Sequence, residues 1–127
     1  MSIFDRMMEK NPEILAEKEQ AKMEVKRLSK AFDEPFIVTC SPISQKQMTY
    51  VAENAKNLQE QRVYFILECC KVEGKKFSDK SWLDWTGCLK GEDVIRKLFR
   101  TGEISALYNK ISELSGYGED AVAELKN

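Results

Sequence analysis

The sequence predicts a mainly α-helical fold: a compact single domain of five or six helices with one short strand or small hairpin. Apolar residues recur at helical spacing along most of the chain, and one stretch, Phe36–Cys40, is rich in β-branched residues and bounded by prolines. A chain of 127 residues can bury about two-thirds of its unfolded surface in one core. We expect one domain over 1–127, with a flexible amphipathic arm (1–11), a charged helix (12–32) and a globular part (36–127).

The first eleven residues have the pattern of an amphipathic arm. Four large apolar side chains have the spacing of one face of a short helix. They are Ile3, Phe4, Met7 and Met8.

A charged helix is predicted to follow the arm. Asn11-Pro12 is a strong start signal, because asparagine caps helices and proline fits their first turn. From Pro12 to about Lys30, a narrow apolar stripe runs along a wide charged face. The stripe consists of Ile14, Ala21, Val25, Leu28 and Phe32. Such a helix either lies on the surface of its own domain or pairs with another chain.

A strand and a capped helix come next. Asp33-Glu34-Pro35 ends the charged helix, since the residue before a proline disfavours helical backbone. Phe36–Cys40 is the predicted strand, and Ser44 with Gln47 forms a capping box that begins a helix. The apolar positions of that helix are Met48, Val51, Ala52, Ala55 and Leu58.

The middle of the chain should hold the most buried segment. Residues 62–72 are apolar on all sides, and their length favours a helix over a strand. A turn at 73–76 leads to a loop-like stretch, 77–87, which carries Trp82 and Trp85. Such a pair either pins the loop to the core or marks a partner site. A helix then begins at Gly91, with Val94, Ile95, Leu98 and Phe99 on its apolar side.

The C-terminal stretch predicts a helix, a tight turn and a short last helix. The stripe of the first helix is Ile104, Leu107, Tyr108, Ile111 and Leu114. Ser115-Gly116 follows at once, and glycine can adopt the left-handed conformation that ends a helix. The short last helix would begin at Gly118 and carry Ala121, Val122 and Leu125.

The same stretch resembles the C-terminus of the XkdN-like tail assembly chaperones of PBSX-type phages and prophages. Its motif stands here as Gly102-Glu103, Leu107, Ile111, Glu113-Leu114-Ser115-Gly116-Tyr117, Ala121 and Leu125-Lys126-Asn127. The resemblance runs from Phe36 to Asn127, with the first helix similar only in character. The connection after Leu58 is short, so an insertion that some members carry is missing, which puts any contact made through that loop in doubt.

Composition argues against catalysis, cofactors and membranes. There is no histidine, so Ser-His or Cys-His nucleophile pairs cannot form, and no glycine-rich phosphate loop is present. The four cysteines form no C-x-x-C pair, and we expect them to be reduced, buried thiols. They are Cys40, Cys69, Cys70 and Cys88. No segment has a leader pattern or the roughly 20 apolar residues that cross a bilayer. We predict no catalytic, metal or cofactor site, and a cytoplasmic location in the host bacterium.

The resemblance implies a non-enzymatic tail assembly chaperone that binds the long, helical tape measure protein during tail morphogenesis, and self-association is expected as well. The hypothetical partner-binding residues are Ile3, Phe4, Met7, Met8, Ile14, Ala21, Val25, Leu28 and Phe32. Two alternatives stay open. One is a small helical regulator that binds nucleic acid through the basic stretch 71–100, although the net charge of −1 makes nucleic acid a poor partner. The other is a structural subunit of a phage-like particle.

Overall fold

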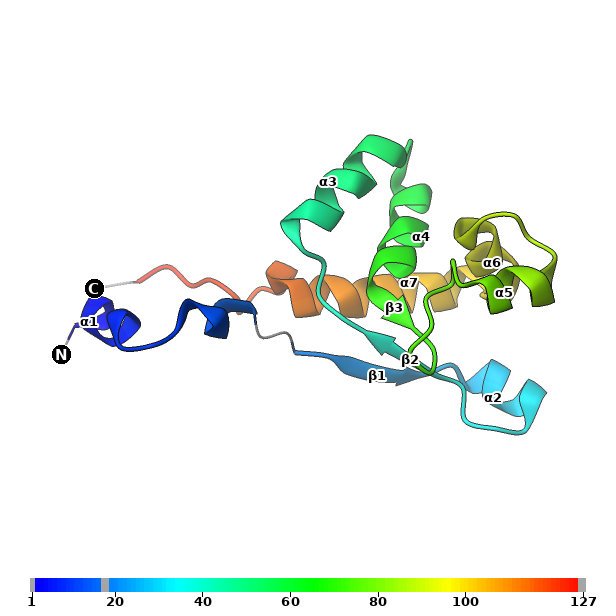
Figure 1. Cartoon of the computed structure of the whole chain (residues 1–127), viewed down its shortest axis with the longest axis horizontal. Helices are drawn as coiled ribbons and strands as arrows, with labels where there is room; N and C mark the ends of the chain where they lie inside the picture. Colours follow the sequence, from blue (N-terminus) through cyan, green and yellow to red (C-terminus); the bar gives the residue numbers. More distant parts are fainter. Residues whose placement is uncertain (1, 17–18, 126–127) are drawn as a thin grey trace.

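Helices surround a small antiparallel sheet in the computed structural model of the chain, which describes residues 2–16 and 19–125 (Figure 1). The helices in these ranges are α1 (Ile3–Met8), α2 (Lys26–Phe32), α3 (Gln45–Asn54), α4 (Leu58–Cys69), α5 (Lys80–Thr86), α6 (Gly91–Leu98) and α7 (Thr101–Ser112). A 3-10 turn, η1 (Pro12–Ala16), follows α1, and a π-type turn, η2 (Glu113–Tyr117), follows α7. The predicted mainly α-helical fold with a minor β element is confirmed.

The sheet has three short strands in the order β1-β2-β3. They are β1 (Ala21–Glu24), β2 (Ile37–Cys40) and β3 (Cys70–Lys71), and both pairings are antiparallel. β2 is the predicted strand. The expected small hairpin is the β1–β2 pair, in which α2 forms part of the connection, while the end of α4 runs directly into β3.

The helix predicted over 12–32 forms only in its last part, as α2 (Lys26–Phe32), and the prediction is wrong for the described residues before it. Asn11 does act as a start signal, because its Oδ1 accepts a hydrogen bond from the Glu13 amide at 3.0 Å, but only a 3-10 turn follows. Residues 21–24 then form a strand whose burial alternates, and a tertiary pairing with β2 overrides the local helical preference. Positions 17 and 18 of the predicted helix lie outside the described residues.

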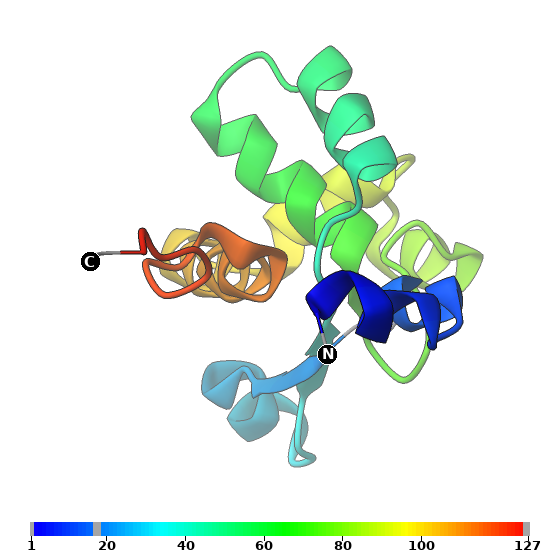
Figure 2. The same cartoon turned by 90° about the vertical axis from the view of Figure 1, so that its left-hand side faces the viewer.

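The core is built around α4, as predicted. Phe65 and Ile66 are fully buried, and α4 packs against both α6 and α7. Figure 2 looks along α7, with α3 and α4 on one side of it and the β1–β2 hairpin and α2 on the other. The capping box at Ser44 is confirmed, since the Gln47 amide donates to Ser44 Oγ at 3.1 Å. Of the apolar positions predicted for α3, Val51 is buried, Ala52 is exposed, and Leu58 instead opens α4.

The end of α7 also matches its prediction. Gly116 has a φ of 88°, the left-handed conformation expected after the last apolar turn. Ser115 Oγ donates to the Ile111 carbonyl at 2.6 Å and accepts from the Ile43 amide at 2.9 Å. This serine therefore ties the end of α7 to the segment that follows β2.

Two local predictions are wrong. The stretch 77–87 is not a loop throughout, because Asp79 caps α5 by accepting from the Ser81 amide at 3.0 Å. The short last helix predicted from Gly118 is absent from residues 118–125. Val122 and Leu125 are exposed there, so burial of an apolar face does not stabilise a helix. Lys126 and Asn127, the end of the motif, lie outside the described residues.

Candidate protein-binding surfaces

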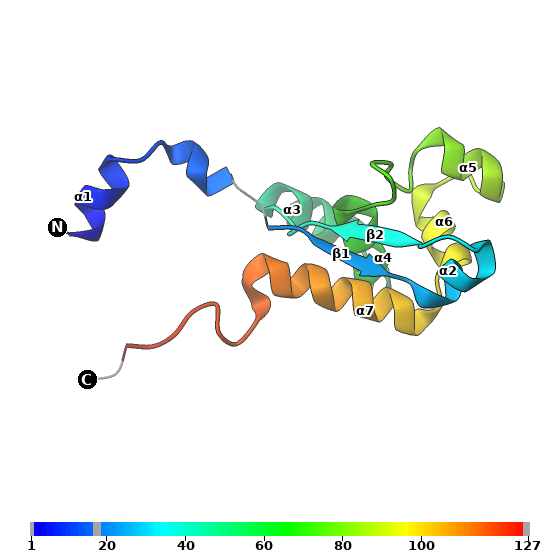
Figure 3. The ribbon, with the colours of Figure 1, turned by 90° about the horizontal axis from the view of Figure 1, so that it is seen from below.

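The first candidate surface is the arm, defined here as residues 2–16. Its helix α1 begins with a capping box. The Asp5 amide donates to Ser2 Oγ at 3.1 Å, and the Ser2 amide donates to Asp5 Oδ2 at 3.3 Å. Neither α1 nor η1 has a buried residue, and Phe4 is 63% exposed. Figure 3 shows the arm and residues 118–125 extending from the same end of the structure. The apolar face of the arm is thus open to solvent.

The structure divides the predicted partner-binding residues among three places. The arm carries Ile3, Phe4, Met7, Met8 and Ile14, all exposed. Val25 and Leu28 belong to the buried core, and Ala21 is half-buried. Phe32 lies at the end of α2 on a different surface and is 49% exposed. These residues therefore do not form one continuous stripe.

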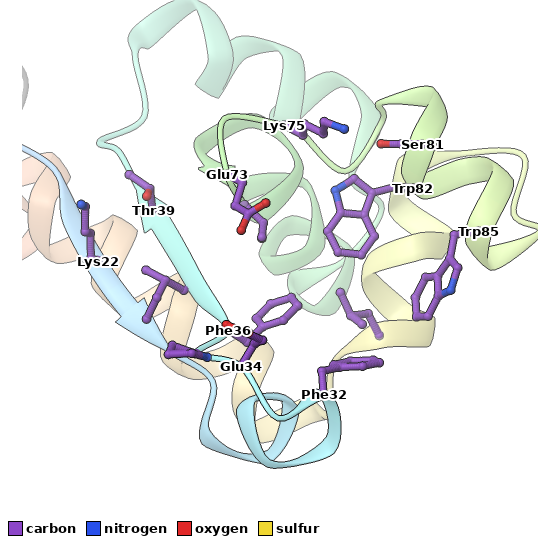
Figure 4. A pocket seen from close by; sticks show the side chains of 14 residues that line it. Lys22, Phe32, Glu34, Phe36, Thr39, Glu73, Lys75, Ser81, Trp82 and Trp85 are labelled. Carbon is purple, nitrogen blue, oxygen red and sulfur yellow. The ribbon is translucent and has the colours of Figure 1, made fainter.

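The second candidate surface is a groove of about 750 Å³ on the outer face of the β1–β2 hairpin (Figure 4). Ile37 and Thr39 of β2 line it because their side chains alternate with Val38 and Cys40, which are buried in the core. Its complete lining is Lys22, Phe32, Glu34, Pro35, Phe36, Ile37, Thr39, Val72, Glu73, Lys75, Ser81, Trp82, Trp85 and Leu98.

A ladder of aromatic rings connects this groove to the core. The ring centroids of Phe32 and Trp85 are 6.1 Å apart, and those of Trp85 and Trp82 are 6.2 Å apart. Trp82 in turn lies 5.2 Å from Phe77, which is fully buried and 5.5 Å from Phe99. Trp85 is 63% exposed, so the outer rings meet solvent while the inner rings hold them in place. Of the two roles that the sequence left open, Trp82 pins the segment and Trp85 is available to a partner.

The charges around the groove are balanced. Lys22 and Lys75 line it together with Glu34 and Glu73 (Figure 4). A polyanion such as nucleic acid is bound by a surface of one sign. The groove therefore fits an apolar protein segment better than a nucleic-acid backbone.

An ion pair fixes the position of α2 beside the groove. Arg27 donates to both carboxylate oxygens of Glu103, from Nε to Oε2 at 3.0 Å and from Nη2 to Oε1 at 2.9 Å. Arg27 Nη2 also donates to the carbonyl of Leu98 at 2.8 Å. The hydrogen bond from Arg27 lowers the pKa of Glu103 below its ordinary value. This bidentate pair joins α2 to the start of α7 and so helps to hold Phe32 at the groove.

Residues 2–16 and 19–125 show neither a metal-binding cluster nor a membrane-spanning helix. No group of three or more His, Cys, Asp or Glu side chains in these ranges could hold a metal ion. None of the helices in the same part of the chain is long and apolar enough to cross a bilayer.

A comparison with protein families matches the profile described as "Phage XkdN-like tail assembly chaperone protein, TAC" to residues 4–126. The chain belongs to this family. The match covers the arm from residue 4 onward and the groove, so the family resemblance begins well before Phe36, where the sequence analysis placed its start. No curated protein and no solved structure matches the chain.

The groove could not be predicted from the sequence because several segments that are distant in the chain build it. Phe32 was assigned to a helical stripe with Val25 and Leu28, and the tryptophans to a loop. A signal for β1 was present, since Ala21, Lys22, Met23 and Glu24 alternate between apolar and charged side chains. Four residues are too few to choose between a strand and a helix without the pairing partner.

Proposed function

We propose that the protein binds the tape measure protein in the cytoplasm of the host bacterium, without catalysis, and keeps it soluble until the tail tube forms around it. Family membership supports a role in tail assembly. The observation that carries the proposal is the exposed apolar arm, which has no buried residue and lies within the family match from residue 4 onward.

The arm has the chemistry needed to cover an apolar helix. Its exposed large side chains are Ile3, Phe4, Met7, Met8, Ile14 and Leu15. A short amphipathic helix can bury such a face against apolar helices of a partner. The two methionines adapt to irregular surfaces because their side chains are unbranched and polarisable. The arm is therefore suited to many similar sites along one long protein.

The groove offers a second contact for the same partner. Its open end presents Trp85 and Phe32, and tryptophan is enriched among residues that dominate binding energy. Two weak contacts on one chain, repeated by several copies along one partner, strengthen each other through effective concentration. Self-association of the chaperone on its partner is part of the proposal for this reason.

Co-expression with a tape measure protein tests the proposal. The expected result is a soluble complex with several copies of the chaperone for each partner, measured by light scattering on the purified material. A partner that stays insoluble, with the chaperone running alone, would contradict the proposal. In that case a fixed ring or filament formed by the chain alone would support a structural subunit, and strongly salt-dependent binding to DNA or RNA would support a nucleic-acid-binding regulator.

A further inference from the structure

Two cysteines that the proposed function does not use face each other across the sheet. Cys40 ends β2 and Cys70 begins β3, and they are register partners. Both side chains are buried, and their Sγ atoms are 3.6 Å apart. The two thiols are therefore already in contact.

The backbone around this pair has the geometry of a narrow antiparallel pair. The Ser41 amide donates to the Cys69 carbonyl at 2.9 Å, so residues 41 and 69 are joined by a backbone hydrogen bond. The Cys70 amide donates to Ile66 in the last turn of α4, not to β2. Cys40 and Cys70 thus form a non-hydrogen-bonded pair, whose Cα atoms typically lie about 4.5 Å apart. A disulfide needs a Cα separation of about 4.4 to 6.8 Å.

We propose that Cys40 and Cys70 are a redox modification site that closes to an intrachain disulfide when the protein meets a peroxide. In the first step, the Cys40 thiolate attacks one oxygen of hydrogen peroxide, which yields a Cys40 sulfenic acid and releases hydroxide. In the second step, the Cys70 sulfur attacks the sulfenic sulfur, and the departing hydroxyl leaves as water. Two thiols are oxidised, one peroxide is reduced, and two waters form in total.

The local chemistry assigns the order of attack. The hydrogen bond between the two thiols lowers the pKa of Cys40 against the opposing effect of burial, and the positive charge of Lys110 lowers it further. The same contact, together with burial, raises the pKa of Cys70. The positive charge of Lys110 favours the thiolate at Cys40, so the proposal takes Cys40 as the attacking sulfur and Cys70 as the resolving one. β3 has only two residues, so local opening of this strand gives the oxidant access.

The disulfide would lock a region next to the groove. It closes the loop between residues 40 and 70 and joins β2, which lines the groove through Ile37 and Thr39, to the end of α4. Closing a loop of this length removes conformational freedom from the unfolded chain. The oxidised protein should therefore melt at a higher temperature than the reduced protein.

Peptide mapping of the full chain after hydrogen peroxide treatment tests the site. Trypsin releases Cys40 in peptide 31–46 and both Cys69 and Cys70 in peptide 63–71, since each is bounded by lysine or arginine. The expected product is a monomer in which these peptides are joined with the loss of two hydrogen atoms. Dithiothreitol should separate them.

Matched variants identify the resolving sulfur. Cys69→Ala should keep the cross-link and Cys70→Ala should lose it, while Cys88→Ala controls for a thiol elsewhere in the fold. Three outcomes would overturn the proposal: a link through Cys69, oxidation of Cys40 to sulfinic acid without a link, or unreacted thiols at peroxide levels that oxidise Cys88. Fragmentation of the joined peptides between Cys69 and Cys70 assigns the linked sulfur in the unmodified chain, and so decides between these outcomes even if a variant fails to fold.

Discussion

The arm and the groove are both exposed and apolar, but they are built in opposite ways. The arm depends on a local capping box at Ser2 and Asp5, and it buries nothing. The groove depends on tertiary structure, since its outer rings rest on Trp82, Phe77 and Phe99, which lead into the core. A surface made locally can be changed without harm to the fold, whereas in a surface made by packing only the outermost side chains can be changed in this way.

This difference means that stability and binding should separate in the arm and remain linked in the groove. Phe4 and Met7 are mostly exposed, so a change at either residue removes little tertiary packing. Trp82 contacts both a buried ring, Phe77, and the exposed ring of Trp85. An arm variant that lowers stability together with binding, or a Trp82 variant that lowers binding alone, would contradict this difference.

The largest expected effect is that of a charge in the core. Ile66 is fully buried on α4, so Ile66→Asp places an unpaired carboxylate among apolar side chains. We expect loss of the cooperative thermal transition, measured by circular dichroism. The same change in the arm, Met7→Asp, is the matched control and should leave the transition where it is, because Met7 is 54% exposed. Equal melting of the two variants would remove the distinction between arm and core.

The next effect concerns the two tryptophans. Trp82→Ala removes a half-buried ring that packs on Phe77 and Phe36, and should lower the free energy of unfolding by about 2 kcal/mol. Trp85→Ala should lower it by less than about 1 kcal/mol, because the ring is mostly exposed. Urea titrations of both variants measure these values. A greater loss for Trp85→Ala would mean that the outer ring holds the fold together.

A smaller effect is expected from the ion pair behind the groove. Glu103→Gln weakens the bidentate contact with Arg27 and should cost about 1 kcal/mol, since solvent partly screens the pair. The pKa of Glu103 is lowered in the folded protein, so its contribution is present above the unfolded pKa and is lost as pH falls through the folded pKa. Stability curves at several acidic pH values should show a weaker acid dependence in the variant. Glu113→Gln, in the more exposed pair with Lys110, is the control and should change little.

The smallest effect on stability is predicted for removal of the arm. A chain lacking residues 2–16 keeps β1, Val25 and Leu28, and should unfold at the same urea concentration as the full chain. A drop in the midpoint would show that the arm packs on its own domain in solution. A larger deletion, to residue 32, would be uninformative because it removes a strand and two core residues.

The sequence was a good guide where one helix face meets one core. Ile104, Leu107 and Ile111 recur every three or four residues, and the helix that they predict is the one observed, closed at Gly116. The capping box at Ser44 was equally readable, because it needs only two side chains three residues apart. Patterns whose residues all lie within one helix can be predicted directly from the sequence.

The candidate surfaces were predictable only in part. The apolar face of the arm was apparent from the spacing of Ile3, Phe4, Met7 and Met8. The groove was not, because Phe32, Ile37 and Trp85 come together only when β1 pairs with β2 and α5 packs beside α6. Pairing between distant segments leaves no local signal strong enough to outweigh helical propensity.

The most direct test of the central proposal is the affinity for the tape measure protein of the full chain and of two variants. Isothermal titration should show binding that is lost when Phe4 and Met7 are both changed to serine, and weakened but retained in Trp85→Ala. Both variants should keep the unfolding midpoint close to that of the full chain, since these residues are exposed. Unchanged affinity in the serine variant would contradict the assignment of the arm as the main contact, and no binding by the full chain would contradict the proposed function itself.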